Sequence, residues 1–365
     1  MTTTARSSAP AMSQADHVER LMRDLIGCFD TFAVYLGLRL GLYEALAELD
    51  RATPTALAAH AGIDERYARE WLEHQAVGGL VEVAQDEHGD RAFVLPSALR
   101  EVLLDEHSMF HGGPLTFAGA AVASVLPALL DAFRSGGGVA FSDYGPDMRD
   151  HIERLNRPMF EHELAASWLP AMPDLEARLR AEPPARILDV ACGSGWSTIV
   201  LAQAFPLTRV VGIDLDAASI DRARTNAEAT SGISDRIGFE VADASDLRFT
   251  DRFDVAFIFE ALHDLAQPTD ALAAIQRALA PGGSVVIGDE KVAPAFVAPG
   301  DELERLMYGF SLLHCLPAAR TDLGSVATGT VMRPDTVQRY AEAAGFTRFE
   351  VVPIEHDMWR FYRLG

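Results

Sequence analysis

The sequence is poor in cysteine and in positive charge. Its three cysteines, Cys28, Cys192 and Cys315, lack the paired spacing of a disulfide framework or of a cysteine zinc site. Lysine occurs once, at Lys291, and 53 acidic residues outnumber 31 basic ones, which gives a formal net charge of −22. Because nucleic-acid binding needs positive charge against phosphate, this balance argues against a nucleic-acid partner.

Long hydrophobic runs are also missing. The first residues contain no apolar segment of the signal-peptide kind, and the most apolar stretch, Thr116–Leu130, is shorter than the roughly 18 residues of a membrane span. We therefore predict a buried helix there, no membrane partner and a cytoplasmic protein. The 365 residues, 49% of them hydrophobic, suffice for two or three domains.

The first third of the chain shows the element order of a winged helix. Residues 1–14 are expected to form a disordered tail and residues 15–105 a mainly helical domain. Helical periodicity covers Val18–Cys28, Thr31–Glu48 and Glu65–Val77, and strand patterns at 79–83 and 91–95 predict a hairpin. A DNA-binding recognition helix needs a basic face, which the mixed charges of Glu65–Val77 do not provide. We predict a winged helix-turn-helix dimerisation domain and a homodimer formed through it.

Residues 106–180 are predicted to be a helical connector that includes a lid. The glycine run at 135–138 and the segment Phe141–Gly145 indicate a loop that either links two elements or covers an active site. Tyr144 in this loop is a candidate to line a cofactor pocket.

Residues 181–365 alternate strands with helices. Strands are predicted at 186–191, 209–214, 237–241, 254–259 and 284–288, with helical patterns between them and two further strands at 348–353 and 357–363. This order predicts an α/β domain with a Rossmann-like, doubly wound sheet of seven strands.

A glycine-containing turn follows the first of these strands. Gly193-Ser194-Gly195 leads into a helix, but Thr198 stands where a dinucleotide fingerprint needs a third glycine. Acidic residues end three successive strands, where ligands bind in such sheets. Asp214 can accept from both hydroxyls of a ribose, Asp243 can accept from an adenine amino group, and Asp189 suits an ammonium group.

With this glycine turn and these acidic residues at successive strand ends, residues 184–290 resemble the class I S-adenosylmethionine (SAM)-dependent methyltransferases. Together with the winged helix, nearly the whole chain resembles the plant-type and bacterial small-molecule O-methyltransferases. From Asp254 onward the chain is also similar to an actinobacterial group of methyltransferases of mostly unassigned substrate. The resemblance implies SAM as cofactor, a small-molecule substrate and a role in secondary metabolism. Expected cofactor contacts are Asp189, Ala191, Gly193, Ser194, Gly195, Asp214, Leu215, Asp243, Ala244, Phe259, Glu260 and Tyr144.

The pair His263-Asp264 follows the fourth strand, in the place of the His-Asp pair of O-methyltransferases. The resemblance implies that His263 is the general base that takes the proton of a hydroxyl, and an imidazole pKa near ~6.5 suits that role. We expect the carboxylate of Asp264 or of Glu290 to orient it.

Two alternatives stay open. Two histidines and a carboxylate form a facial metal-binding set, and His263, Asp264 and His314 resemble the set that holds iron or zinc in α-keto acid C-methyltransferases. The second alternative is a non-catalytic winged-helix regulator that senses SAM.

Overall fold

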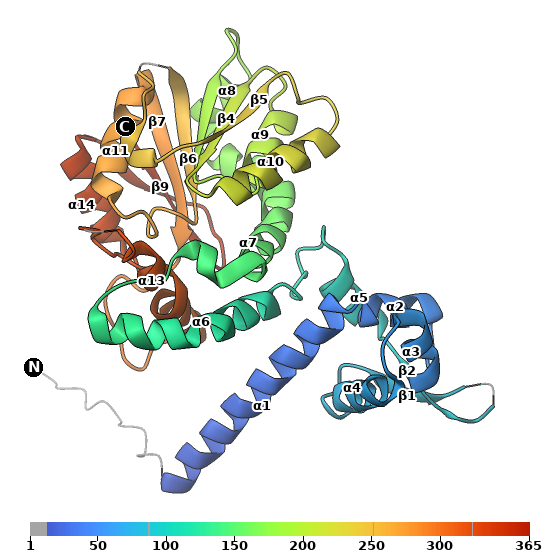
Figure 1. Ribbon diagram of the computed structural model, residues 1–365. Coiled ribbons are helices and arrows are strands. Elements are labelled where there is room, and N and C mark those ends of the chain that lie inside the picture. Colours follow the sequence, from blue (N-terminus) through green and yellow to red (C-terminus); the bar gives the residue numbers. More distant parts are fainter. Residues whose placement is uncertain (1–12, 87, 251, 323) are drawn as a thin grey trace, which may run out of the picture. The chain divides into compact units, whose positions relative to one another are not determined.

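The computed structural model describes residues 13–86, 88–250, 252–322 and 324–365, and the chain divides into two compact units, Met1–Asp105 and Glu106–Gly365 (Figure 1). Of the tail expected over residues 1–14, residues 1–12 lie outside the described residues. Ser13 caps the first helix and Gln14 begins it, so this helix starts earlier than predicted. Residues 106–180 belong to the second unit.

The first unit has the predicted winged-helix order. Its elements are α1 (Gln14–Arg39), α2 (Leu42–Leu49), α3 (Pro54–Ala61), α4 (Glu65–Val77), the antiparallel hairpin of β1 (Glu82–Gln85) and β2 (Arg91–Val94), and α5 (Ser97–Leu104). The two helices expected at Val18–Cys28 and Thr31–Glu48 correspond to α1 and α2, but the predicted break near residues 29–30 is wrong. The chain instead bends at Gly41, whose left-handed backbone (φ 67°) ends the helical path without steric cost.

The core of the first unit leaves half of α1 uncovered. Leu46, Leu57, Leu72 and Phe93 are buried in this core. The N-terminal half of α1 leads away from the other helices of its unit (Figure 1). Six of its apolar side chains are 48–69% exposed: Val18, Leu21, Met22, Leu25, Ile26 and Phe29. A contiguous apolar face of this kind marks an interaction surface.

The second unit is built on seven strands, as predicted. The strands are β3 (Arg186–Val190), β4 (Arg209–Asp214), β5 (Ile237–Val241), β6 (Phe253–Phe259), β7 (Leu279–Glu290), β8 (Phe349–Val352) and β9 (Trp359–Leu364). Their order is β5-β4-β3-β6-β7-β9-β8. Strand β9 pairs antiparallel with both β7 and β8, and all the other neighbouring strands pair in parallel. The chain therefore leaves β3 toward β4 on one side and later crosses to β6 on the other.

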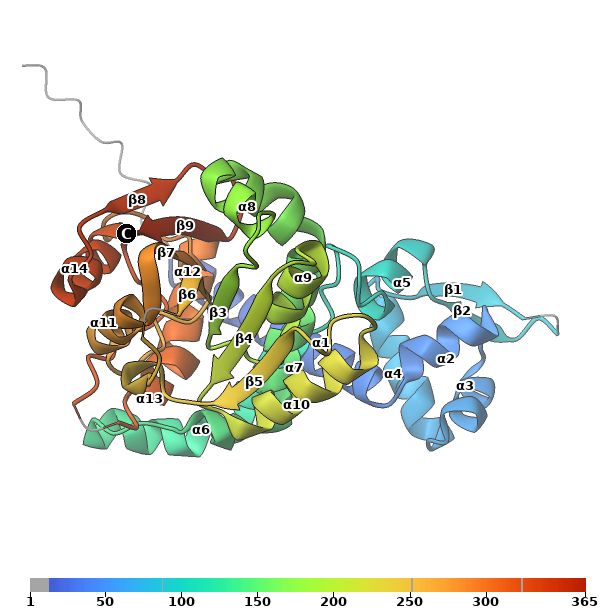
Figure 2. The same cartoon turned by 90° about the horizontal axis from the view of Figure 1, so that it is seen from above.

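Helices cover both faces of this sheet (Figure 2). The helices are α6 (Leu115–Ser135), α7 (Gly145–Met159), α8 (Pro173–Leu179), α9 (Trp196–Ala204), α10 (Ala217–Ala229), α11 (Pro268–Ala278), α12 (Glu302–Phe310), α13 (Leu316–Ala319) and α14 (Pro334–Ala344). Short turns are η1 (Phe141–Tyr144), η3 (Leu169–Ala171) and η4 (Ala244–Asp246), and π-helical turns are η2 (Phe160–Trp168) and η5 (Ser311–Cys315).

Alternation along each strand divides the core into two layers. Ile187 and Phe257 pack with α9 on one face, whereas their neighbours Leu188 and Ile258 pack with α11 on the other. Because successive strand residues point to opposite faces, a strand buried on both sides reads as a continuous apolar run.

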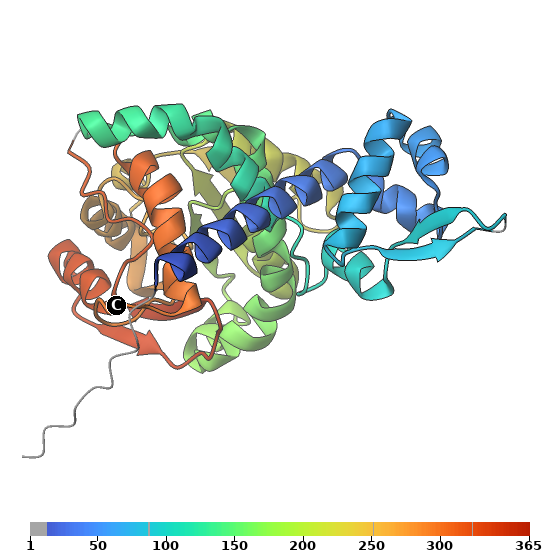
Figure 3. The ribbon, with the colours of Figure 1, turned by 90° about the horizontal axis from the view of Figure 1, so that it is seen from below.

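The apolar run at Thr116–Leu130 forms part of α6, a helix of 21 residues. Among the described residues, α6 is the one helix that is by itself long and apolar enough to cross a membrane. The helices α1 and α2 meet the same criterion only when they are taken together as one bent segment. Core helices of soluble proteins also have this composition. One face of α6, the teal helix in Figure 3, packs against α7 and η5.

Candidate active site

A pocket of about 910 Å³ opens at the carboxyl edge of the sheet in the second unit. Its floor comes from the segments that follow β3, β4, β5 and β6, and its walls come from η1, α7, η5 and α13. In an open α/β sheet this edge, where the strand order reverses, is the ligand-binding position. Most of the expected cofactor contacts line it: Ala191, Gly193, Ser194, Asp214, Leu215, Asp243, Ala244, Phe259 and Glu260.

Asp189 is an exception and corrects the expectation of a cofactor contact. Its carboxylate is 1% exposed and accepts hydrogen bonds from the hydroxyls of Ser197, at 2.6 Å, and Thr198. Burial raises the pKa of Asp189 to about 6, although those two hydrogen bonds act in the opposite direction. The residue therefore ties β3 to the start of α9, which explains why Thr198 replaces a third glycine.

The two glycines of the turn differ in role. Gly193 (φ 53°) lines the pocket, and a Cβ there would meet nothing within 4 Å. Gly195 (φ 81°) lies outside the pocket lining, and a Cβ there would come within 2.9 Å of Phe239 and Ala223. Packing alone therefore requires glycine at position 195, and the expected cofactor contact there stays a prediction.

Asp214 is fixed by the backbone around it. Its two carboxylate oxygens accept from the backbone N–H groups of Gly193 and Asp216, both at 2.8 Å. Burial raises the pKa of Asp214, and the hydrogen bonds from Asp216 and Gly193 counter that shift. Asp243 accepts from the N–H of Ser245 at 2.8 Å at the start of η4. Both carboxylates are therefore held in place at the pocket floor.

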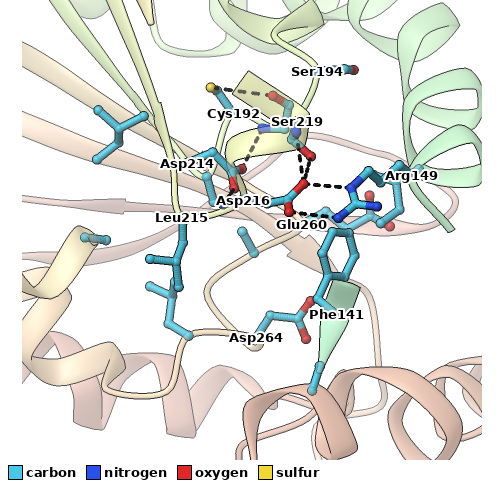
Figure 4. A pocket seen from close by; sticks show the side chains of 18 of the residues that line it. Phe141, Arg149, Cys192, Ser194, Asp214, Leu215, Asp216, Ser219, Glu260 and Asp264 are labelled. Carbon is cyan, nitrogen blue, oxygen red and sulfur yellow. Dashed lines mark hydrogen bonds and ion pairs between the residues drawn. The ribbon is translucent and has the colours of Figure 1, made fainter. Parts of the chain in front are cut away.

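Helix α7 closes one side of the pocket through ion pairs. The Arg149 guanidinium donates to both oxygens of Asp216, at 2.7 and 2.8 Å, and Figure 4 shows the two side chains facing each other. The expected lid residue Tyr144 is buried instead, donates its hydroxyl to the Leu313 carbonyl and does not line the pocket. Phe141 of the same turn does line it, so this segment forms a wall of the pocket.

His263 is buried among carboxylates behind the pocket. Its Nδ1 lies 2.7 Å from Asp289 Oδ1, and its Nε2 lies 3.4 Å from Asp264 Oδ1. Burial alone would lower the pKa of His263, but the charges of Asp289 and Asp264 and the bond to Asp289 outweigh it and raise the pKa well above 6.5. His263 is 2% exposed and is absent from the pocket lining, whereas Asp264 lines the pocket.

Glu290 does not orient His263, contrary to one of the two expectations. Burial and the charge of Glu260 raise the pKa of Glu290 well above its ordinary value, and the two carboxyl groups share a hydrogen bond. Asn156 of α7 donates to Glu260 from its other side. The orienting residue is Asp289, which sequence reasoning missed: neighbours on a strand face opposite sides, so Asp289 and Glu290 cannot both reach His263.

The expected metal ligands do not assemble. Within the described parts of the chain, the ligand atoms that lie within 4.8 Å of one another belong to His263, Asp264 and Cys315, and His314 is outside that group. His263 Nδ1 is already engaged by Asp289, and neither His263 nor Cys315 lines the pocket. Of these three residues Asp264 alone lines the pocket, so the residues present do not form the expected iron or zinc site of His263, Asp264 and His314.

Two family models match the chain. Residues 187–283 match a methyltransferase domain, and residues 28–103 match the Rv2258c-like winged HTH domain. The second unit thus contains a methyltransferase domain and the first contains a winged-helix domain, which confirms the two assignments made from the sequence.

Solved structures share the fold over nearly the whole chain. Mitomycin 7-O-methyltransferase has a TM-score of 0.71 at 20% identity and covers 96% of this chain and 98% of its own. Human N-acetylserotonin methyltransferase in complex with SAM has a TM-score of 0.70 at 17% identity and covers 98% and 99%. The predicted class I methyltransferase fold is confirmed.

Curated relatives match over part of the chain. The 27-O-demethylrifamycin SV methyltransferase of Amycolatopsis mediterranei is 33% identical over 122 residues, which are 33% of this chain and 44% of the relative. The demethylmenaquinone methyltransferase of Deinococcus radiodurans is 30% identical over 167 residues, which are 46% and 66% of the two chains. The chain thus spans 44% and 66% of the lengths of these two relatives.

The pair His263–Asp289 makes stability depend on pH. A histidine whose folded-state pKa is raised stabilises the fold below its unfolded pKa, and this contribution disappears as the pH rises through the folded pKa. Asp289→Asn is expected to lower the free energy of unfolding by about 3 kcal/mol near pH 6, and by less at higher pH. Denaturant titrations followed by tryptophan fluorescence measure this, with the exposed Asp335→Asn as control. A loss of unfolding free energy in Asp289→Asn that increases with pH would contradict the ion pair.

Proposed function

We propose that this protein is a SAM-dependent methyltransferase that methylates a hydroxyl group of a small molecule. The observation that carries the proposal is the position of Asp214, whose carboxylate is fixed at the pocket floor beside the Gly193-Ser194 turn. A fixed carboxylate at this strand end is suited to accept from both hydroxyls of the SAM ribose. Asp243 lies at the end of the next strand, where it can accept from the adenine.

The names of similar proteins support the reaction class. Mitomycin 7-O-methyltransferase transfers a methyl group to oxygen by its name, and an enzyme of neocarzinostatin biosynthesis with the same fold is described with S-adenosylhomocysteine and 1,4-dihydroxy-2-naphthoic acid. The pocket volume of about 910 Å³ is large enough for a cofactor and a second molecule together.

The charges of the pocket indicate the class of acceptor. Eight acidic residues line it: Asp150, Glu153, Asp214, Asp216, Asp243, Glu260, Asp264 and Asp322. Two arginines line it as well, and both are already paired, Arg149 with Asp216 and Arg222 with Asp150 and Glu153. Because no pocket arginine among the described residues is left to bind a carboxylate, we propose an acceptor that is neutral or cationic.

This charge balance disfavours the metal-dependent alternative. A 2-keto acid carries a carboxylate that the paired arginines of the pocket do not neutralise, and the group of mutually close ligand atoms among the described residues is His263, Asp264 and Cys315, without His314. We therefore propose no iron or zinc and no C-methylation of a keto acid. Metal analysis of the purified protein checks this point.

The winged-helix unit is proposed to mediate a homodimer and not to bind nucleic acid. On α4, Arg66 pairs with Glu70 and Arg69 with Glu65, so these arginines are not free for phosphate. The exposed apolar face of α1 is proposed as the contact with a second copy. A gel-shift screen at low salt tests the alternative function, which is a non-catalytic winged-helix regulator that senses SAM.

Asp214→Asn is expected to weaken the binding of S-adenosylhomocysteine about tenfold to a hundredfold, because a charged acceptor of two hydroxyls is lost. Calorimetry on the full chain measures the affinity, with the exposed Asp246→Asn as matched control. Absence of binding by the wild-type protein would refute the proposed function itself.

Methyl transfer from radiolabelled SAM is expected to favour neutral acceptors. The panel pairs each neutral phenol with its carboxylate, for example 1-naphthol with 1-hydroxy-2-naphthoic acid. We expect the neutral member to react about tenfold faster or more, since an unneutralised charge in a partly buried site costs more than 1 kcal/mol. Faster methylation of the carboxylates would show that the acceptor class is wrong.

Replacing Leu21 and Leu25 together by glutamate is expected to convert a dimer into a monomer of 39.6 kDa, because charges replace apolar side chains at the proposed contact. Light scattering coupled to size exclusion measures the mass. Val77→Glu, at a position on α4 that is 91% exposed, is the control and should stay dimeric. A wild-type monomer would exclude the dimer.

A further inference from the structure

The pocket lies between two groups of elements that have different apolar cores. Its floor belongs to the sheet, whose two faces are packed by the large apolar clusters. Its walls include η1, the first part of α7 and η5, which share a smaller cluster with α6 through Val125, Tyr144, Met148, Ile152 and Leu313. We call α6, η1, α7 as far as Ile152 and η5 the wall lobe. The wall lobe thus has a core of its own.

The mouth of the pocket lies between the wall lobe and the floor. Exposed lining residues of the wall lobe are Ser142 and Pro146, and exposed lining residues of the floor are Leu215, Ala218 and Asp243. Since exposed lining residues border the opening, a cofactor that binds to the floor has to pass between the wall lobe and the segments that follow β4 and β5.

An ion pair fastens the wall lobe to the floor beside this mouth. Arg149 of α7 donates to both carboxylate oxygens of Asp216, and the two side chains are 21% and 20% exposed. The bonds from Arg149 lower the pKa of Asp216, so both groups are charged at neutral pH. The backbone N–H of Asp216 in turn donates to Asp214 at 2.8 Å, which places the ion pair next to the proposed ribose acceptor.

The same face of α7 makes further polar bonds to the floor. Glu153 pairs with Arg222 of α10 at 2.8 Å, and Asn156 donates to Glu260 after β6. Together with Arg149 these positions have the spacing i, i+4 and i+7, which lies along one side of a helix. Water competes well for partly exposed ion pairs, so such contacts open and close at small cost, whereas the apolar cluster keeps the wall lobe together.

The chain is suited to bend at both ends of α7. Gly145, the first residue of the helix, has φ 72° and ψ −165°, a conformation that is essentially restricted to glycine. At the other end Pro158 lies inside the helix, and the π-helical turn η2 begins at Phe160, which packs in a cluster of the sheet. Helices bend at prolines and at π-helical turns.

We propose that α7 is a lid over the cofactor and that the pair of Arg149 with Asp216 is its latch. The inference rests on the proposed function, because SAM and S-adenosylhomocysteine are the molecules that pass the lid. Arg149 acts through Asp216 and is a positioning residue. Since the same pair has to open for entry and for exit, the latch sets the rate of cofactor exchange and leaves the affinity unchanged.

Surface plasmon resonance on the immobilised full chain, with S-adenosylhomocysteine as the probe, measures both rate constants. In Arg149→Gln we expect association and dissociation to accelerate by the same factor, about threefold to tenfold, while the dissociation constant stays within about twofold. Asp216→Asn keeps an oxygen to cap α10 and should act likewise. The double variant should be no faster than either single variant, because both remove one interaction.

Ionic strength provides a readout that needs no substitution. Between about 0.05 M and about 0.5 M salt, both rate constants of the wild type should rise together, because screening weakens a partly exposed ion pair. The rate constants of Arg149→Gln should change less. Arg339→Gln is the matched control, since Arg339 forms an exposed pair with Asp335 on α14 at 2.8 Å, outside the pocket lining. Its rate constants should equal those of the wild type.

Two results would overturn the latch. Faster dissociation with an equal loss of affinity in Arg149→Gln would show that the arginine contacts the cofactor itself. Unchanged rate constants in that variant, or wild-type rate constants that do not respond to salt, would show that the pair does not limit exchange. Failure of the wild-type protein to bind S-adenosylhomocysteine would instead refute the proposed function.

Discussion

The parallel pairing of β3 with β4 on one side and β6 on the other is the constraint on which the site depends. Val190, Ile213 and Ile258 lie in register across these three strands, so the strands end at one edge of the sheet. Everything that follows them converges there, although the segments are separated by up to 70 residues of chain. Asp189 secures this edge from inside, since it binds the first turn of α9 through two hydroxyls.

The chemistry of the site follows from where buried carboxylates lie. Asp289 comes from β7 and engages the His263 imidazole, whose pKa it raises. The second imidazole, His314 on η5, has the Cys315 sulfur 3.4 Å from its Nδ1, and burial lowers its pKa. The environments of the two histidines therefore shift their pKa values in opposite directions.

Much of the fold was predictable because its signals are periodic. Apolar runs of five to seven residues between helical patterns located the strands of the methyltransferase domain, and the acidic residue at the end of β4 located the cofactor floor. Periodicity does not report which way a side chain turns after a strand. Asp189 therefore looked like a ligand, although it faces α9, and Tyr144 looked like a lid residue, although it packs inward.

The catalytic assignments needed three-dimensional contacts for a different reason. Choosing between Asp289 and Glu290 requires knowledge of the face of β7 on which His263 lies, and a sequence shows only that the two are adjacent. Placing His314 among the pocket-lining residues requires knowledge of the π-helical turn η5 to which it belongs. Nothing in the spacing of residues 311–315 signals that turn.

A crystal structure with S-adenosylhomocysteine tests the account most directly. We expect the ribose hydroxyls to lie on Asp214 and the adenine to lie near Asp243, with His263 still paired to Asp289. S-adenosylhomocysteine bound elsewhere, or ribose hydroxyls that do not contact Asp214, would contradict this prediction.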